Sequence, residues 1–113
     1  MHELSITQSM LDIVLEQAER AGAGKVGVIN LVIGELSGFV TEAMTFYFDF
    51  ISKDTPAEGA RLNFKPVSAQ GRCHKCGQVF PLADPDWTCP KCGASDIEII
   101  AGKELFVESI EVE

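Results

Sequence analysis

The first part of the chain shows a helical pattern of apolar positions. From about Leu4 to Ala21, apolar side chains recur every three or four residues, and charged side chains lie largely on the other side, as in an amphipathic helix. Gly22 and Gly24 follow, and glycine tolerates the left-handed backbone with which many helices end. We therefore predict one helix here. Its buried stripe is expected to consist of Leu4, Leu11, Val14, Leu15 and Ala18.

A strand pattern and a second helical pattern come next. Residues 25–33 (KVGVINLVI) are rich in β-branched side chains and lack clean polar alternation, which favours a strand inside a sheet with both faces at least partly covered. Residues 34–38 (GELSG) predict a turn. Thr41 can then cap a helix over about 42–52, whose aromatic side chains we expect in the core. The common face of this helix is expected to hold Ala43, Tyr47, Phe50 and Ile51.

The second half of the chain predicts two further strands around a different kind of segment. Residues 61–67 (RLNFKPV) alternate apolar and polar positions, and Pro66 favours an edge strand because it cannot donate a backbone hydrogen bond. Residues 104–113 (ELFVESIEVE) predict a long strand that returns to the first sheet. We expect an α+β fold in which both chain ends form a small sheet with two helices, interrupted by an inserted zinc-ribbon-like four-cysteine domain. The expected domains are 1–69 together with 103–113, and 70–102.

Composition and charge narrow the class of protein. The chain has 113 residues, of which 46% are hydrophobic and 23% are charged, and no apolar run approaches the roughly 20 residues of a membrane span. The N-terminus lacks the basic region and apolar stretch of a secretory signal, so we expect the chain in the cytoplasm. Its formal net charge of −8 repels phosphate backbones and argues against nucleic acid as a partner.

Four cysteines form two short pairs. Cys73 and Cys76 are followed by Gly77, Cys89 and Cys92 are followed by Gly93, and the twelve residues 77–88 separate the pairs. In a reducing compartment such thiols are metal ligands rather than two disulfides. Two intervening residues let both sulfurs of a pair face one ion, and the following glycine permits the tight turn. We therefore predict that Cys73, Cys76, Cys89 and Cys92 bind one tetrahedral zinc ion.

This zinc is expected to be structural. Four thiolates fill the coordination shell, whereas a catalytic zinc keeps a position open for water. The segment has few large apolar side chains, so metal binding is expected to supply its folding free energy. Two alternatives remain: iron in the same knuckles, as in the electron-transfer protein rubredoxin, and replacement of one cysteine by His74, which is otherwise a solvent-facing knuckle residue.

The N-terminus offers a second set of metal ligands. His2 is the only histidine outside the cysteine segment. A terminal amine, the amide nitrogen of residue 2 and the Nδ1 atom of its imidazole can close two fused chelate rings around a metal, a geometry that favours nickel(II) or copper(II). The bulky second residue normally keeps Met1 in place, so its amine should persist. The alternative is that His2 is merely an exposed terminal residue.

The order of these motifs resembles a known family. The opening MHELS, the following helix, VIGELSG at 32–38, the two CxxC pairs and the closing ELFVESIEV resemble the HypA/HybF family of hydrogenase-maturation nickel chaperones over nearly the whole chain. The resemblance implies nickel ligation at Met1 and His2, with Glu3 as a required neighbour, and structural zinc on the four cysteines.

The resemblance also implies partners and a role. It implies delivery of Ni(II) to the large subunit of [NiFe]-hydrogenase, cooperation with the GTPase HypB, and no catalytic activity. An exposed terminal site with few ligands suits a carrier because nickel must be released again, and protons should weaken binding as the pH falls. The competing hypothesis is a zinc-ribbon interaction module in which His2 has no function.

Overall fold

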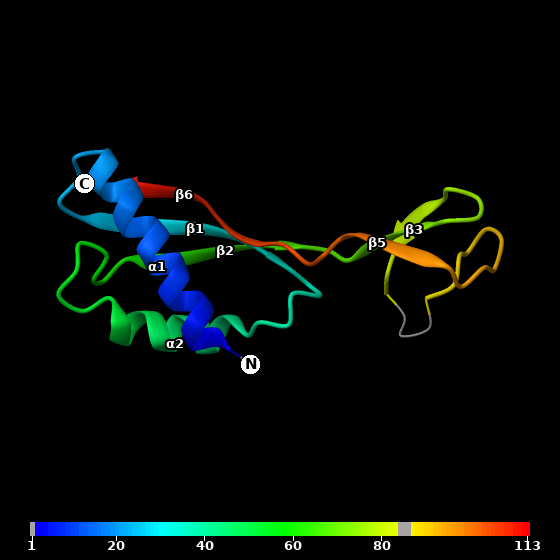
Figure 1. Ribbon diagram of the computed structural model, residues 1–113, viewed down its shortest axis with the longest axis horizontal. Helices are drawn as coiled ribbons and strands as arrows, with labels where there is room; N and C mark the ends of the chain where they lie inside the picture. Colours follow the sequence, from blue (N-terminus) through cyan, green and yellow to red (C-terminus); the bar gives the residue numbers. More distant parts are fainter. Residues whose placement is uncertain (1, 84–86) are drawn as a thin grey trace.

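The computed structural model describes residues 2–83 and 87–113. Two three-stranded sheets, each with its own group of buried apolar residues, lie at opposite ends of an elongated molecule measuring 55 × 26 × 16 Å (Figure 1). The larger lobe holds both helices and both marked chain ends. The smaller lobe holds the four cysteines, and we call it the cysteine lobe.

The sheet of the larger lobe is built from both ends of the chain. Strand β1 (Val26–Gly34) lies between β2 (Arg61–Val67), which is parallel to it, and β6 (Leu105–Val112), which is antiparallel to it. The predicted inner strand, edge strand and returning strand are thereby confirmed. Pro66 lies on the edge strand β2, where the missing amide costs the sheet least.

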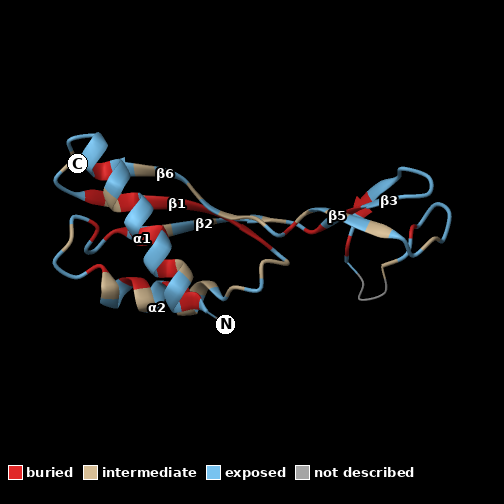
Figure 2. Ribbon diagram, in the orientation of Figure 1, coloured by how far each residue is buried: buried red, intermediate tan, exposed pale blue. Residues whose placement is uncertain are grey.

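Helix α1 (Glu3–Arg20) packs one stripe against this sheet. Figure 2 shows the stripe as buried segments along the helix, and Val14 and Ala18 are fully covered. The prediction was wrong for Leu4, which is 48% exposed because it lies beyond the packed core, beside the outer side of the second helix. The helix ends as expected, with Gly22 in the left-handed conformation. Among the described residues, no helix is long and apolar enough to cross a membrane.

Helix α2 (Thr41–Ile51) buries fewer aromatic rings than expected. Met44 and Phe48, four residues apart, face the core, whereas Phe46 and Phe50 are each 69% exposed. The prediction of a buried Phe50 was wrong because Phe50 lies about 200° around the helix from Phe48. The helix also begins one residue earlier than predicted, so Thr41 is its first helical residue and not its cap.

The cysteine lobe contains a second sheet that the sequence pattern did not predict. Strand β3 (Gln70–Cys73) lies between β4 (Val79–Pro81) and β5 (Ile97–Ala101), and both pairings are antiparallel. These strands have only three to five residues, too few to show a clear period. The buried centre of the lobe consists of Ala69, Cys73, Phe80, Leu82 and Cys89.

Hydrogen bonds join the two lobes at a narrow junction. The amide of Gly34 donates to the carbonyl of Glu104 at 2.7 Å, and the amide of Leu36 donates to that of Gly102 at 2.6 Å. A Cβ atom at Gly34 would lie 2.1 Å from the Gly102 carbonyl oxygen, so the chains pass in backbone contact. The side chain of Leu36 packs against the buried centre of the cysteine lobe. The connection is therefore a packed junction rather than a free linker.

A row of polar side chains crosses the sheet of the larger lobe. Asn30 on β1 is only 9% exposed, and its side-chain amide donates to the Ser109 hydroxyl on β6 at 3.0 Å. The Asn63 amide on β2 donates to the Asn30 side-chain oxygen at 2.8 Å. Alternation along β1 places Asn30 on the face opposite Ile29 and Leu31, which pack with the helices. The face of the sheet away from the helices is thus fixed by polar contacts.

Candidate metal sites

The four cysteines meet at one point of the cysteine lobe. Their Sγ atoms all lie within 4.8 Å of one another, with Cys73 and Cys92 at 3.5 Å and Cys76 and Cys89 at 3.5 Å. A disulfide would need about 2.05 Å, whereas sulfurs about 2.3 Å from a shared zinc ion lie about 3.8 Å apart. The arrangement therefore fits four ligands around one metal ion such as zinc, and all four thiols are free.

Each cysteine pair sits in the same kind of turn. The amide of Gly77 donates to the Cys73 carbonyl at 2.9 Å, and the amide of Gly93 donates to the Cys89 carbonyl at 2.8 Å. Both glycines have a positive φ, 79° and 75°, which a residue with a side chain adopts only with strain. The reason given from the sequence for a glycine after each CxxC pair is thus confirmed.

Neighbouring groups shift the pKa values of two cysteines of the cluster in opposite directions. Burial opposes ionisation of Cys89, but the amides of Cys92 and Lys91 and the neighbouring thiols outweigh burial and lower its pKa from 9.0 to about 6. The amide of Ala94 lowers the pKa of Cys92. The surrounding thiols and burial outweigh that effect and raise the pKa of Cys92 to about 11. Thiolates this close together repel one another, and a divalent cation at the centre would offset that repulsion. This is the electrostatic reason that such a cluster suits a metal.

His74 turns toward carboxylates at the surface of the lobe. Its Nδ1 atom lies 3.1 Å from the Asp96 carboxylate, and its Nε2 atom lies 3.7 Å from that of Glu98. The ring is half exposed, and His74 is not part of the four-sulfur group. This geometry favours the solvent-facing role over the alternative in which His74 replaces a cysteine.

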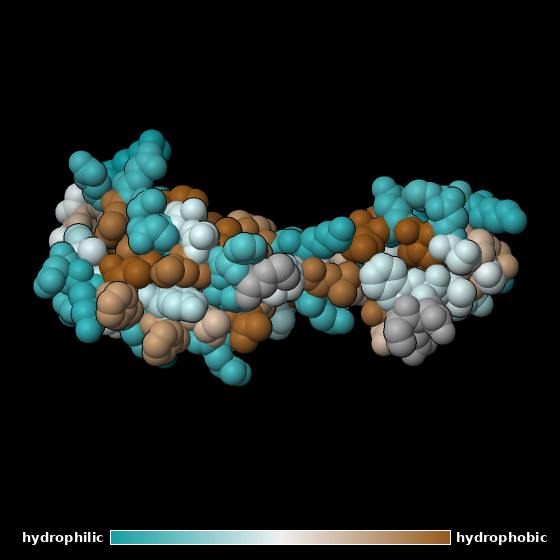
Figure 3. All heavy atoms as spheres, turned by 60° about the horizontal axis from the view of Figure 1, so that its bottom comes forward, coloured by the Kyte–Doolittle hydropathy of each residue, from teal (hydrophilic) through white to brown (hydrophobic). Residues whose placement is uncertain are grey.

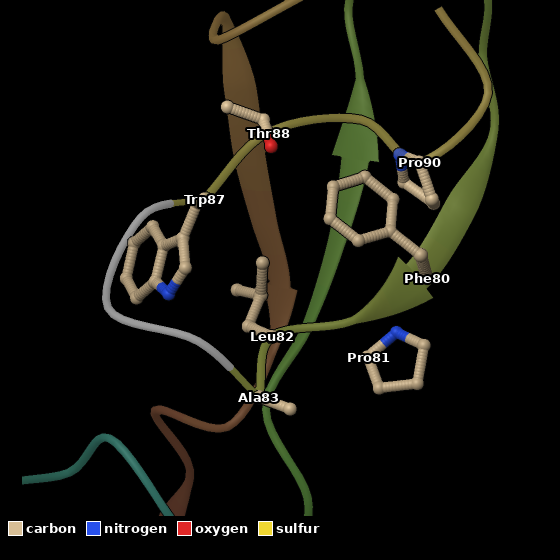
Figure 4. Close-up of a pocket in the computed structure, with 7 residues that line it drawn as sticks. All are labelled: Phe80, Pro81, Leu82, Ala83, Trp87, Thr88 and Pro90. Carbon is tan, nitrogen blue, oxygen red and sulfur yellow. The ribbon is translucent and has the colours of Figure 1, made fainter. Parts of the chain in front are cut away.

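An apolar slot lies beside the second cysteine pair. Figure 4 shows Leu82 between the rings of Trp87 and Phe80 at this slot. Thr88 and Pro90, on either side of Cys89, line the same slot, whose volume is about 280 Å³. Sequence reasoning missed these residues, although the aromatic and aliphatic side chains between the two cysteine pairs were the available signal. They provide apolar contacts beside the cysteine cluster.

His2 precedes α1, which belongs to the larger lobe and not to the lobe that holds the cysteines (Figure 1). His2 is exposed and precedes α1 with φ 48° and ψ 22°, a left-handed conformation uncommon for a residue with a side chain. Met1, predicted as a nickel ligand, lies outside the described residues. The imidazole of His2 is thus accessible from solvent.

Glu3 differs from His2 because its side chain points inward. It is 6% exposed, and its Oε2 atom accepts a hydrogen bond from the Val40 amide at 3.3 Å. Its backbone carbonyl accepts a hydrogen bond from the Thr7 hydroxyl at 2.5 Å. Glu3 therefore ties the start of α1 to the segment that enters α2.

Known proteins match this chain over its whole length. A family model described as hydrogenase/urease nickel incorporation, metallochaperone, hypA matches residues 1–112. A hydrogenase maturation factor HypA from Dehalococcoides mccartyi is 49% identical over 113 residues, covering all of this chain and 95% of the relative. One from Caldanaerobacter subterraneus subsp. tengcongensis is 47% identical over 114 residues, covering both chains completely.

Solved structures share the arrangement of the elements. The solution structure of a HypA protein superposes with a TM-score of 0.76 at 25% identity, covering 100% of this chain and 97% of the other. The solution structure of the Ni metallochaperone HypA from Helicobacter pylori gives a TM-score of 0.70 at 24% identity, covering 99% and 97%. At this level of identity the second similarity is evidence for the fold alone.

Proposed function

Because this chain belongs to the HypA family of metallochaperones for nickel incorporation into hydrogenase and urease, we propose that it carries Ni(II) at its first residues and helps insert it into the large subunit of [NiFe]-hydrogenase. The family role is that of a metallochaperone and not of an enzyme. Within that role, the proposal concerns the ligands of the nickel, the purpose of the cysteine cluster and the partners.

The observation that carries the nickel proposal is the placement of His2 next to Glu3. His2 is exposed at the start of α1, while Glu3 is buried and accepts a hydrogen bond from Val40. The anchored Glu3 holds the start of the helix, so that the amine of Met1, the amide nitrogen of His2 and its imidazole can share one nickel ion. Nitrogen ligands of this kind suit tetragonal Ni(II).

The cysteine cluster is proposed to hold zinc for structure only. Four thiolates complete a tetrahedral shell, leaving no position for a substrate or a water molecule. We assign nickel binding to a domain made of 1–69 and 103–113, and structural zinc to a domain made of 70–102. The two separate buried clusters support a division into two domains, with Ala69, which belongs to the smaller cluster, at the boundary.

The proposed partners are the GTPase HypB, as the source or regulator of nickel transfer, and the hydrogenase large subunit, as its recipient. The support is the family, whose description names hydrogenase and urease nickel incorporation. We also propose that the protein works in the cytoplasm, where thiol ligands stay reduced.

Nickel titration of the untagged, zinc-loaded protein tests this proposal. Substitution His2→Ala should abolish nickel uptake, because it removes the imidazole, and should leave the zinc content at about one ion per chain. The matched control is His74→Ala, which removes the other histidine and should leave nickel uptake intact. Isothermal titration calorimetry measures nickel binding, and metal analysis measures zinc.

Two outcomes would contradict the proposal. Equal nickel affinity in His2→Ala and the unchanged protein would favour the alternative of a zinc-ribbon interaction module. Loss of nickel uptake in His74→Ala instead would move the nickel site to the cysteine lobe. A tag ahead of Met1 blocks the terminal amine, so the protein must carry none.

A further inference from the structure

Among the described residues, exposed apolar side chains line a groove between the two helices. Leu4 of α1 and Phe46 and Phe50 of α2 are 48%, 69% and 69% exposed. They line a hollow of about 640 Å³, which we call the helix groove. In Figure 3, apolar side chains gather on this side of the larger lobe among hydrophilic ones. The complete lining is Leu4, Ser5, Gln8, Phe46, Tyr47, Phe50 and Ile51.

The core contacts of α2 come from residues other than the two exposed rings. Met44 and Phe48 already bury the inner face of this helix completely. Phe46 contacts Tyr47 edge to face, with ring centroids 5.5 Å apart, and Lys53 lies 5.6 Å from the centre of the Phe50 ring. Two phenylalanines one helical turn apart, largely open to water, cost free energy that a structural role does not offset. Such a pair is typical of a binding surface.

Charged residues border the groove and indicate what fits there. On the exposed side of α2, Glu42 lies one turn before Phe46 and Asp49 three residues after it, so both lie next to Phe46 on its outer side, away from the other groove residues of α2. On α1, Asp12 accepts a hydrogen bond from Gln8, a groove residue, at 3.2 Å. Lys53 provides an opposing positive charge. The border is thus more acidic than basic, like the chain as a whole at −8.

This charge argues against a second copy of the chain as the occupant. Two copies would bring two acidic borders together, and like charges around a shared apolar contact oppose association. A basic border on the partner removes that repulsion and also speeds encounter. A groove between two helices matches a third helix, whose ridges of side chains fill it.

The groove is continuous with the start of the chain. Ser5 lines both the helix groove and a second, shallower hollow that contains His2. A helix lying in the groove would therefore end or pass close to His2. The location joins a docking surface to the proposed nickel site.

We propose that the helix groove binds an amphipathic helix of a nickel-transfer partner, with apolar side chains against Phe46 and Phe50 and lysine or arginine residues against the acidic border. The link to nickel transfer rests on the proposed function, whereas the docking surface does not depend on His2. The partner is defined by this chemistry alone.

The test uses the untagged, zinc-loaded chain and a fluorescein-labelled synthetic helix. The probe carries leucines along one face and lysines on both borders, and a twin peptide replaces every lysine with glutamate. Fluorescence anisotropy should show tighter binding of the lysine peptide. The double variant Phe46→Ser and Phe50→Ser should weaken its binding by about tenfold or more, as expected for central apolar contacts.

A matched control comes from the sheet of the larger lobe. Phe106 on β6 is 51% exposed and lies outside the groove, so Phe106→Ser removes the same ring at a different place and should leave peptide affinity unchanged. A second double variant, Glu42→Lys with Asp49→Lys, keeps the apolar floor and should reverse the preference between the two peptides. Thermal unfolding confirms that each variant is folded.

Each remaining outcome overturns the inference. Equal binding of both peptides, or an equal loss in Phe106→Ser, would remove the groove as the site. Concentration-dependent dimerisation that Phe46→Ser and Phe50→Ser abolish would identify a second copy as the occupant.

Nickel titration of the groove variants should match that of the unchanged protein, and His2→Ala should bind the peptide normally. Failure of docking and failure of nickel binding are thereby distinguished.

Discussion

At the scale of single residues, Glu3 and His2 are neighbours in the chain whose side chains lie in opposite environments. Its carboxylate is buried against the Val40 amide, while His2 beside it faces water. A hydrogen bond to an ionised carboxylate is stronger than one between neutral groups. The buried residue thus fixes the backbone from which the exposed residue extends.

We expect Glu3→Ala to lower the free energy of unfolding, because it removes the acceptor of the hydrogen bond from the Val40 amide. Glu3→Gln should lose less, because its side-chain carbonyl can still accept from the Val40 amide. Urea unfolding followed by circular dichroism measures both. The control is Glu19→Ala, on the exposed side of the same helix. Equal stability of Glu3→Ala and Glu19→Ala would show that the Val40 contact contributes nothing.

At the scale of the elements, the junction between the lobes depends on a position without a side chain. Gly34 ends β1 where the backbone of Gly102 and Glu104 passes, and a Cβ atom there would lie 2.7 Å from the Glu104 nitrogen and closer still to Gly102. Backbone atoms cannot move aside as the end of a flexible side chain can. A methyl group at this position must separate the chains.

Substitution Gly34→Ala is expected to destabilise the protein by about 3 kcal/mol, at the upper end of the range for overpacking. Gly24→Ala is the matched control, because a Cβ atom at Gly24 meets nothing within 4 Å. Thermal unfolding of the two variants gives the comparison. A Gly34→Ala variant as stable as Gly24→Ala would mean that the junction opens without cost.

The elements also show what sequence patterns can and cannot predict. Strands β1, β2 and β6 were predictable because each has seven or more residues with a clear composition, and Pro66 even marked the edge. The buried face of α2 was not predictable, because an aromatic-rich helix offers two apolar faces. Only tertiary packing determines that Phe48 and not Phe50 is buried. The short strands of the cysteine lobe follow from metal-ligand turns rather than from periodicity.

Some features of the candidate sites were predictable from the sequence and others were not. The meeting of the four cysteines was predictable from spacing, since two intervening residues already restrict where the sulfurs can point. The inward turn of Glu3 was not predictable, because its partner Val40 lies 37 residues away and contributes only a backbone amide. The helix groove was hidden by the assumption that phenylalanine rings belong to the core.

At the scale of the whole molecule, two buried clusters predict two responses to metal loss. We expect Cys73→Ser, or removal of the proposed zinc by a chelator, to unfold the cysteine lobe and leave the larger lobe folded, because the two buried clusters are separate and metal binding is proposed to stabilise the smaller one. Two-dimensional NMR should show the loss of dispersed amide signals from 70–102 only.

Because the two lobes pack together at the junction, we expect unfolding of the cysteine lobe to affect a few residues of the larger lobe. Leu36 belongs to a segment of the larger lobe but packs into the cysteine lobe, so its signal should shift with those of 70–102. The metal-loaded His2→Ala variant serves as the control and should keep every signal of the cysteine lobe. Collapse of the whole spectrum after zinc removal would contradict the two-lobe description.

The row formed by Asn63, Asn30 and Ser109 favours one register of the three strands over registers shifted by one residue. These three residues are direct partners across β2, β1 and β6. If β2 or β6 shifted by one position, the buried side chain of Asn30 would lose its hydrogen bond with Asn63 or with Ser109. The last strand leaves the ribosome only after the entire metal-binding insert. The Asn30–Ser109 contact therefore distinguishes the native register of β6, the last strand to be synthesised, from registers shifted by one position.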